Sequence, residues 1–178
     1  SFRRALELDA GNGGAHAGLA EILYEGGDYA GAVTSATTAL ELDQQLTRAY
    51  GVRGKSNNAL GKPEEAYSDL AMAITVNADD PDANLAFAQV YQTQDNFAMA
   101  ATYYRKAVQL NPNLTGAYGE LGEILILQQD YESALDVLNV ATEKMPDNGK
   151  MQYYLGLALE NTGQTDQALV AYQRATEL

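Results

Sequence analysis

The side chains that most often carry catalysis are scarce in this chain of 178 residues. His16 is the only histidine and there is no cysteine, so the sequence lacks a Cys–His pair and a two-histidine metal motif. No glycine-rich loop precedes a lysine as a phosphate-binding loop requires. The 24 acidic residues follow helix surfaces and helix starts. We therefore predict no catalytic, cofactor or metal site in this chain, and an enzyme elsewhere in a longer polypeptide stays open.

Basic residues are few, and several of them gather in one stretch. The chain has 11 lysines and arginines and a net charge of -13. Four of the basic residues are Arg48, Arg53, Lys55 and Lys62. Phosphate backbones and anionic membranes attract clustered basic groups, so neither is expected as a partner. The four basic residues favour either an acidic partner or, as we prefer, a solvated face balanced by Glu64 and Glu65.

The hydrophobic pattern contains no membrane span. No window approaches eighteen uninterrupted apolar residues, so we expect a soluble chain without membrane insertion. No targeting segment is visible, and without cysteine the compartment is undetermined. The chain opens on Ser1, which favours a segment of a longer polypeptide.

A period of 34 residues organises the whole chain. One alanine column consists of Ala32, Ala66, Ala100, Ala134 and Ala168. A second column consists of Ala39, Ala73, Ala107, Ala141 and Ala175, with Ala5 one period earlier. A third column of small residues consists of Ala20, Gly54, Ala88, Gly122 and Gly156. We predict one array with repeats at 13–46, 47–80, 81–114 and 115–148, a truncated repeat at 149–178, and the end of a preceding repeat at 1–12.

Within each repeat, two segments with apolar residues at helical spacing flank a recurring turn. The expected ends of the first helices are Gly27, Gly61 and Gly163, and the expected N-caps of the second helices are Asp28, Asn96 and Asp130. Pro63 suits the first turn of a helix. Each repeat is therefore predicted to be a pair of antiparallel helices, and the fold class is all-α.

The glycines of the third column call for close helix packing. Glycine inside a helix costs about 1 kcal/mol relative to alanine. We therefore interpret Gly54, Gly122 and Gly156 as places where neighbouring helices approach too closely for a larger side chain.

These columns resemble the tetratricopeptide repeat family. In the repeat at 115–148 the family pattern is met at Tyr118, Leu121, Gly122, Ala134, Leu138, Ala141 and Pro146. The departures are His16, Asn84 and Gln152 in place of a large residue, Asn57 in place of an aromatic residue, and Gln44 and Ala78 in place of proline. The resemblance implies a right-handed superhelical solenoid of about five repeats with an N-terminal partial helix.

By this resemblance, the first helices line a concave groove that binds a peptide or a helix of a partner protein. The predicted protein-binding residues are Arg48, Lys55, Asn58, Gln89, Gln92, Glu123, Ile126, Leu127, Tyr153 and Leu157. The last four are aromatic or aliphatic and are the expected anchor for an apolar side chain. Alternatively, these four residues pack against a following helix outside this chain.

Of two further interpretations, a carboxylate clamp is not supported by the residues present and a self-assembling scaffold stays open. The family's clamp for a C-terminal carboxylate needs several lysine, arginine and asparagine residues, and Lys55 alone does not supply them. A scaffold that self-assembles end to end through uncapped solenoid ends, giving a homo-oligomer, remains the alternative function.

Overall fold

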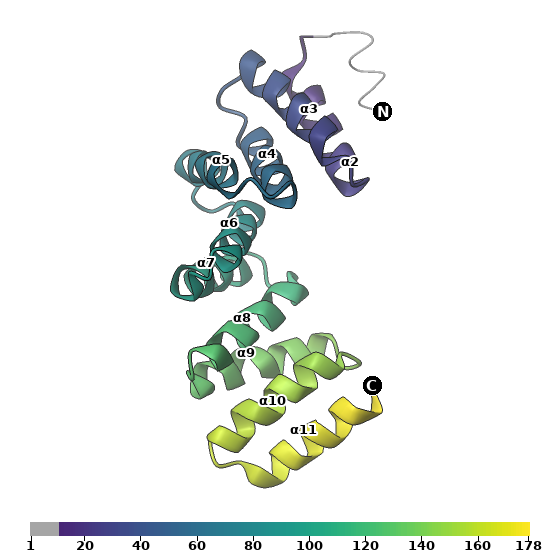
Figure 1. Cartoon of the computed structure of the whole chain (residues 1–178), viewed down its shortest axis with the longest axis vertical. Helices are drawn as coiled ribbons and strands as arrows, with labels where there is room; N and C mark the ends of the chain where they lie inside the picture. Colours follow the sequence, from purple (N-terminus) through teal and green to yellow (C-terminus); the bar gives the residue numbers. More distant parts are fainter. Residues whose placement is uncertain (1–10) are drawn as a thin grey trace. The chain divides into compact units, whose positions relative to one another are not determined.

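The computed structural model describes residues 11–178, which form ten α-helices and no strand (Figure 1). The helices are α2 (Gly13–Glu25), α3 (Tyr29–Leu42), α4 (Thr47–Ala59), α5 (Pro63–Val76), α6 (Pro81–Thr93), α7 (Phe97–Leu110), α8 (Thr115–Leu127), α9 (Tyr131–Lys144), α10 (Gly149–Asn161) and α11 (Thr165–Glu177). The first helices of successive pairs start 34 residues apart. The all-α helical repeat fold predicted from the sequence is confirmed. Ala5 and most of the partial repeat predicted at 1–12 lie outside the described residues.

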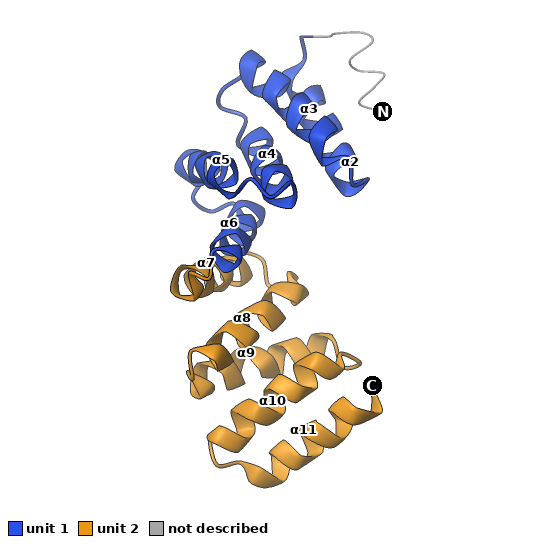
Figure 2. Cartoon of the chain, in the orientation of Figure 1, with its two compact units in different colours: residues 1–94 blue, residues 95–178 orange. Residues whose placement is uncertain are grey.

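The chain divides into two compact units, Ser1–Gln94 and Asp95–Leu178 (Figure 2). In unit 1, α2 packs on α3 and α4, and α4 packs on α5 and α6. In unit 2, α8 packs on α7, α9 and α10, and α10 packs on α9 and α11. The first helices α2, α4, α8 and α10 therefore each lie against both the second helix of their own repeat and the first helix of a neighbouring repeat.

The turn inside each repeat uses the left-handed backbone conformation that glycine tolerates best. Gly27, Gly61 and Gly163 have φ angles of 79°, 71° and 80° and follow the C-cap residue of the first helix, at the predicted helix ends. Asp95 and Gln129 hold the same place with φ angles of 56° and 60°. These two residues adopt a conformation that costs an ordinary side chain about 1–2 kcal/mol.

The predicted N-caps of the second helices are confirmed. The side chains of Asp28, Asn96 and Asp130 accept hydrogen bonds from the backbone N–H of Gly31, Met99 and Ser133. Lys62 and Gln164 stand at the same position and make no such bond. Pro63 lies in the first turn of α5 as expected. The turn is therefore built by local backbone chemistry that repeats along the chain.

We expect Gly163→Ala to lower the free energy of unfolding by about 1 kcal/mol, because a Cβ is strained at its positive φ. Gln129→Gly is the reciprocal change and should raise the free energy of unfolding by about 0.5 kcal/mol. Urea-induced unfolding followed by circular dichroism measures both. Equal stability of the parent and both variants would contradict this account of the turn.

The third column is explained by size matching inside the helix pairs. A Cβ on Gly54 would lie 2.6 Å from Cγ of Leu70, and a Cβ on Gly122 would lie 2.5 Å from Cδ2 of Leu138. A Cβ on Gly156 would likewise lie 2.5 Å from Cε1 of Tyr172. The close approach predicted for these glycines is confirmed. In the first repeat, the same column holds Ala20, which packs in one cluster with a small partner, Ala36.

Candidate functional site

The first-helix face of unit 1 carries paired charges. Arg48 of α4 donates two hydrogen bonds to the Glu21 carboxylate of α2. Lys55 places its Nζ 5.2 Å from the ring centroid of Tyr24. Arg48 and Lys55 line one small cavity of about 60 Å³ together with Glu21, Asp80 and Asp82. Two predicted binding residues are therefore brought together, but within a largely self-neutralised set of charges.

The other predicted binding residues of unit 1 are the amides Asn58, Gln89 and Gln92. Asn58 on α4 and Gln92 on α6 are partly buried, whereas Gln89 on α6 is exposed. Their amide groups offer hydrogen bonds without a net charge.

The prediction of a solvated basic face balanced by Glu64 and Glu65 is wrong for Arg53, which pairs with Asp69. Its guanidinium donates to both carboxylate oxygens of Asp69, at 2.9 and 2.6 Å. Asn57 donates to the same carboxylate at 3.2 Å, and Arg53 also donates to Thr37 at 3.3 Å. Asn57 thus replaces the aromatic residue of the family pattern with a buried polar network. Arg53 is held by Asp69 because this acid lies across the helix pair, whereas Glu64 and Glu65 are exposed.

The first-helix face of unit 2 has a polar centre at Glu123. Its carboxylate accepts hydrogen bonds from Lys150 at 2.7 Å and from the Tyr154 hydroxyl at 2.6 Å. Burial acts to raise the pKa of Glu123, but the bonds from Lys150 and Tyr154 lower it overall. Burial and the bond to Glu123 raise the pKa of Tyr154. Glu123 is therefore a charged acceptor that fixes α10 against α8.

Exposed apolar residues lie beside this polar centre. Tyr153 is 48% exposed, and its ring centroid lies 5.8 Å from that of Tyr154 and 5.9 Å from that of Tyr172. Leu127 at the end of α8 is 60% exposed. Ile126 and Leu157 are partly buried. The four predicted anchor residues thus differ in exposure, and Tyr153 and Leu127 are the most accessible of them.

Tyr172 supports the Tyr153 ring from α11 and donates a hydrogen bond of 2.6 Å to Glu160. Burial and this bond raise the pKa of Tyr172 to about 12. We expect NMR of ring-labelled tyrosine to show Tyr172 ionising near pH 12, and Glu160→Gln to lower that pKa. The folded state keeps the Tyr172 proton more tightly than the unfolded state, so this contribution to stability is lost as the pH rises from 10 towards 12. Ionisation near pH 10 in the parent would contradict the assignment.

The ion-pair partners of the groove residues were not predicted from the sequence. Glu21–Arg48 and Glu123–Lys150 both join residues 27 positions apart, in successive first helices. Opposite charges at this spacing are a signal that the sequence does contain. The roles of Tyr154 and Tyr172 leave no comparable signal, because tyrosine also occurs at core positions of this fold.

Within residues 11–178, no three histidine or acidic side chains gather as a metal site would need. Over the same residues, no helix is long and apolar enough to cross a membrane.

Comparison with known proteins decides the family. One tetratricopeptide repeat model matches residues 93–152, and another matches residues 1–47 and 128–178. The chain belongs to the tetratricopeptide repeat family. A solved structure described as "YrrB: a TPR protein with an unusual peptide-binding site" superposes with a TM-score of 0.81 at 22% identity, over 99% of this chain and 91% of that one. A structure of MamA gives a TM-score of 0.76 at 21% identity, over 89% and 92%. These likenesses show the tetratricopeptide repeat fold.

Curated relatives match part of their own length. Mouse serine/threonine-protein phosphatase 5 is 30% identical over 111 residues, which are 60% of this chain and 22% of the phosphatase. The Drosophila melanogaster homologue of the BBSome complex member BBS4 is 29% identical over 132 residues, 73% of this chain and 26% of that protein. The chain therefore spans about a quarter of the length of these relatives. The small glutamine-rich tetratricopeptide repeat-containing protein 2 of Mycosarcoma maydis is 31% identical over 104 residues, 54% of this chain and 30% of that protein. The tetratricopeptide repeats make this chain a protein–protein interaction module.

Proposed function

We propose that this chain is a non-catalytic module that binds a peptide or a helix of a partner protein on its first-helix faces. The face formed by α8 and α10 in unit 2 is the principal contact. The observation that carries the proposal is the exposure of Tyr153, whose side chain is half-exposed while its ring packs against the rings of Tyr154 and Tyr172. A large apolar ring that is already ordered binds with little loss of conformational entropy.

The surroundings of Tyr153 supply polar contacts as well. Glu123 and Lys150 lie on the same two helices, and the Lys150 side chain is 52% exposed. A peptide backbone or a polar side chain next to the apolar anchor can bond to these groups. Interfaces commonly combine an aromatic anchor with such a polar rim.

Unit 1 offers a different first-helix face. Its charges are paired internally at Glu21 and Arg48, and exposed ion pairs contribute little to affinity. The net charge of -13 supports a protein partner rather than a nucleic acid. We therefore assign unit 1 a secondary role in binding.

The proposal is tested by binding of the chain to a broad peptide array beside a Tyr153→Ala, Leu157→Ala double variant. We expect discrete peptides to bind the parent and to lose about tenfold or more in affinity with the variant, since an aromatic hot spot contributes about 2 kcal/mol.

Ile22→Ala is the matched control. Ile22 is a 52% exposed apolar residue on α2 outside the predicted set, so its truncation should leave binding unchanged. Circular dichroism checks that all variants fold. Equal binding by the parent and the double variant would contradict a role of Tyr153 and Leu157 in peptide binding.

A further inference from the structure

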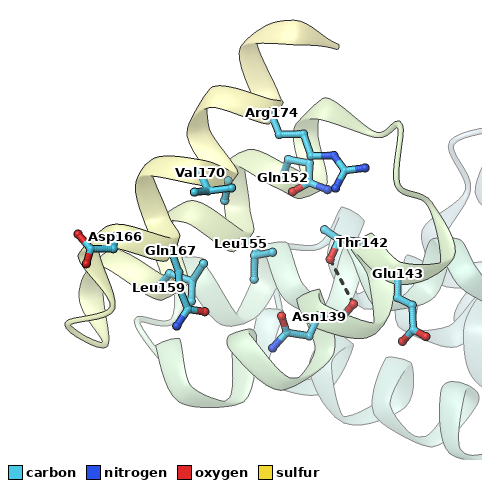
Figure 3. Close-up of a pocket in the computed structure, with 11 residues that line it drawn as sticks. Asn139, Thr142, Glu143, Gln152, Leu155, Leu159, Asp166, Gln167, Val170 and Arg174 are labelled. Carbon is cyan, nitrogen blue, oxygen red and sulfur yellow. Dashed lines mark hydrogen bonds between the residues drawn. The ribbon is translucent and has the colours of Figure 1, made fainter.

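A second surface of unit 2 is hollowed on the side of the second helices. A pocket of about 590 Å³ lies between α9, α10 and α11 (Figure 3). Leu155 and Leu159 of α10 line it together with Val170 and Ala171 of α11 and Thr142 of α9. Helix α8, which carries part of the proposed groove, contributes no residue to it. The pocket is therefore separate from the face around Glu123.

The corresponding pocket three repeats earlier, in unit 1, is more polar and has a smaller volume. There a pocket of about 260 Å³ is lined by Arg53, Asn57, Glu65, Ser68 and Asp69. These residues correspond in the period to Leu155, Leu159, Gln167, Val170 and Ala171. In unit 1 the ion pair of Arg53 with Asp69 occupies the space between the helices. In unit 2 the corresponding leucine and alanine form no ion pair, and the pocket has an apolar part at Leu155, Leu159, Val170 and Ala171 beside polar and charged residues.

A missing ring explains why the unit 2 pocket is larger. Tyr50 of α4 packs against a core cluster that contains Leu40 of α3. The residues three repeats later are Gln152 of the fifth repeat and Thr142 of the fourth, which are smaller or more polar and both line the pocket. The Gln152 amide instead donates to the Pro146 carbonyl at 3.4 Å.

The third repeat also lacks an aromatic residue at the position of Tyr50, but it carries aromatic side chains at other positions nearby. Asn84 stands at this position on α6, and the same helix carries Phe87 and Tyr91, whose ring centroids lie 4.8 Å apart. Tyr67 of α5 joins them, 5.1 Å from Phe87. The fifth repeat has leucine at the positions of Phe87 and Tyr91, and both leucines line the pocket where the third repeat has rings.

We propose that the pocket between α9, α10 and α11 binds an aromatic side chain of a partner peptide. The ligand ring takes the place that Tyr50 occupies in the second repeat. The volume lies within the range of about 300–1,000 Å³ that is usual for ligand pockets. This site goes beyond the proposed groove, because it uses the second helices α9 and α11.

The charges of the rim favour a basic residue next to that ring. Glu143 of α9 and Asp166 of α11 are exposed and line the pocket, and Figure 3 shows them on opposite sides of the leucine pair. Arg174 lies beside Gln152 in the same view. Two carboxylates against one guanidinium select for a peptide with lysine near its aromatic residue.

The test uses the short blocked peptide Gly-Lys-Gly-Phe-Gly-Lys-Gly and the same peptide with alanine in place of phenylalanine. Binding to the whole chain is followed in two-dimensional amide NMR spectra. We expect the phenylalanine peptide to shift the signals of Gln152, Gln167 and Ala171 and to bind about tenfold more tightly than the alanine peptide. Equal binding of the two peptides, or no shift at these residues, would overturn the proposal.

Two variants locate the site. Gln152→Tyr restores the residue of the second repeat, fills the pocket, and should weaken the phenylalanine peptide about tenfold. Val170→Lys changes a residue that is 63% exposed, so the fold is kept while the basic peptide is repelled. If both variants bind like the parent, the pocket is not the site.

Tyr153→Ala separates this site from the proposed groove. The pocket predicts that the affinity of the phenylalanine peptide stays the same in this variant. Loss of binding with Tyr153→Ala, together with normal binding by Gln152→Tyr, would place the peptide in the groove. That result would overturn the proposal of a binding pocket while supporting the proposed function of the groove.

Discussion

Replacing Arg53 by leucine is expected to lower the free energy of unfolding by about 3 kcal/mol. The change removes the partner of Asp69, whose side chain is only 8% exposed, and leaves a carboxylate without its cation in the helix pair. Asn57 remains as a donor at 3.2 Å, but an amide does not neutralise the charge. Urea-induced unfolding followed by circular dichroism measures the loss.

The fifth repeat supplies the control for this prediction. Its corresponding residues are apolar: Leu155, Leu159 and Ala171. The triple variant Arg53→Leu, Asn57→Leu, Asp69→Ala copies them and removes every charge of the network at once. We expect its stability to lie within about 1 kcal/mol of the parent, because apolar replacement of a whole buried ion pair is often neutral or stabilising. A triple variant that is less stable than Arg53→Leu would contradict this account.

Gly122→Ala should lower the free energy of unfolding by about 1–2 kcal/mol, although alanine is the better helix former. The new Cβ would lie 2.5 Å from Cδ2 and 2.6 Å from Cγ of Leu138, so α8 and α9 must separate or Leu138 must leave its rotamer. Thermal or urea unfolding measures the change.

Gly116→Ala is the matched control on the same helix. A Cβ at Gly116 meets nothing within 4 Å, so this variant should not destabilise the chain, and helix propensity should raise its free energy of unfolding by less than about 1 kcal/mol because Gly116 lies in the first turn of α8. In a Leu138→Ala background, Gly122→Ala copies the Ala20 and Ala36 pair of the first repeat and should no longer destabilise. A loss for Gly122→Ala that persists in that background would mean that the clash with Leu138 is not its cause.

The sequence was sufficient to predict the elements that depend on local chemistry. The positive φ of Gly163, the cap at Asp130 and the close approach at Gly122 each follow from a residue type at a fixed place in the period. Because the period holds over the whole chain, one repeat predicts the helices of the next.

The site was less accessible to sequence reasoning, because its properties depend on which side chains meet across helices. Asn57 and Gln152 are both departures from the family pattern, yet they have opposite outcomes. Asn57 joins Arg53 and Asp69 in a polar network, whereas Gln152 lies beside leucines and leaves a pocket. The consequence of each substitution depends on the side chains around it, which come from its own helix and from the helices packed against it.

The exposure of Tyr153 likewise depends on packing that the repeat pattern does not predict. Its column holds Ala17, Gly51, Leu85 and Gly119 in the other repeats, so the period predicts no aromatic residue there. Its support by Tyr172 joins two helices of one repeat, and its contact with Tyr154 connects it to Glu123. Only the packing of α8, α10 and α11 shows these contacts together.

The most direct test of the proposed function is the amide NMR shift map of unit 2 with a peptide selected on the array. The account predicts that the largest shifts fall on the first-helix face, at Glu123, Lys150, Tyr153 and Leu157. Shifts that are absent from α8 and α10 at these residues and confined to α9 and α11 would contradict binding in the proposed groove.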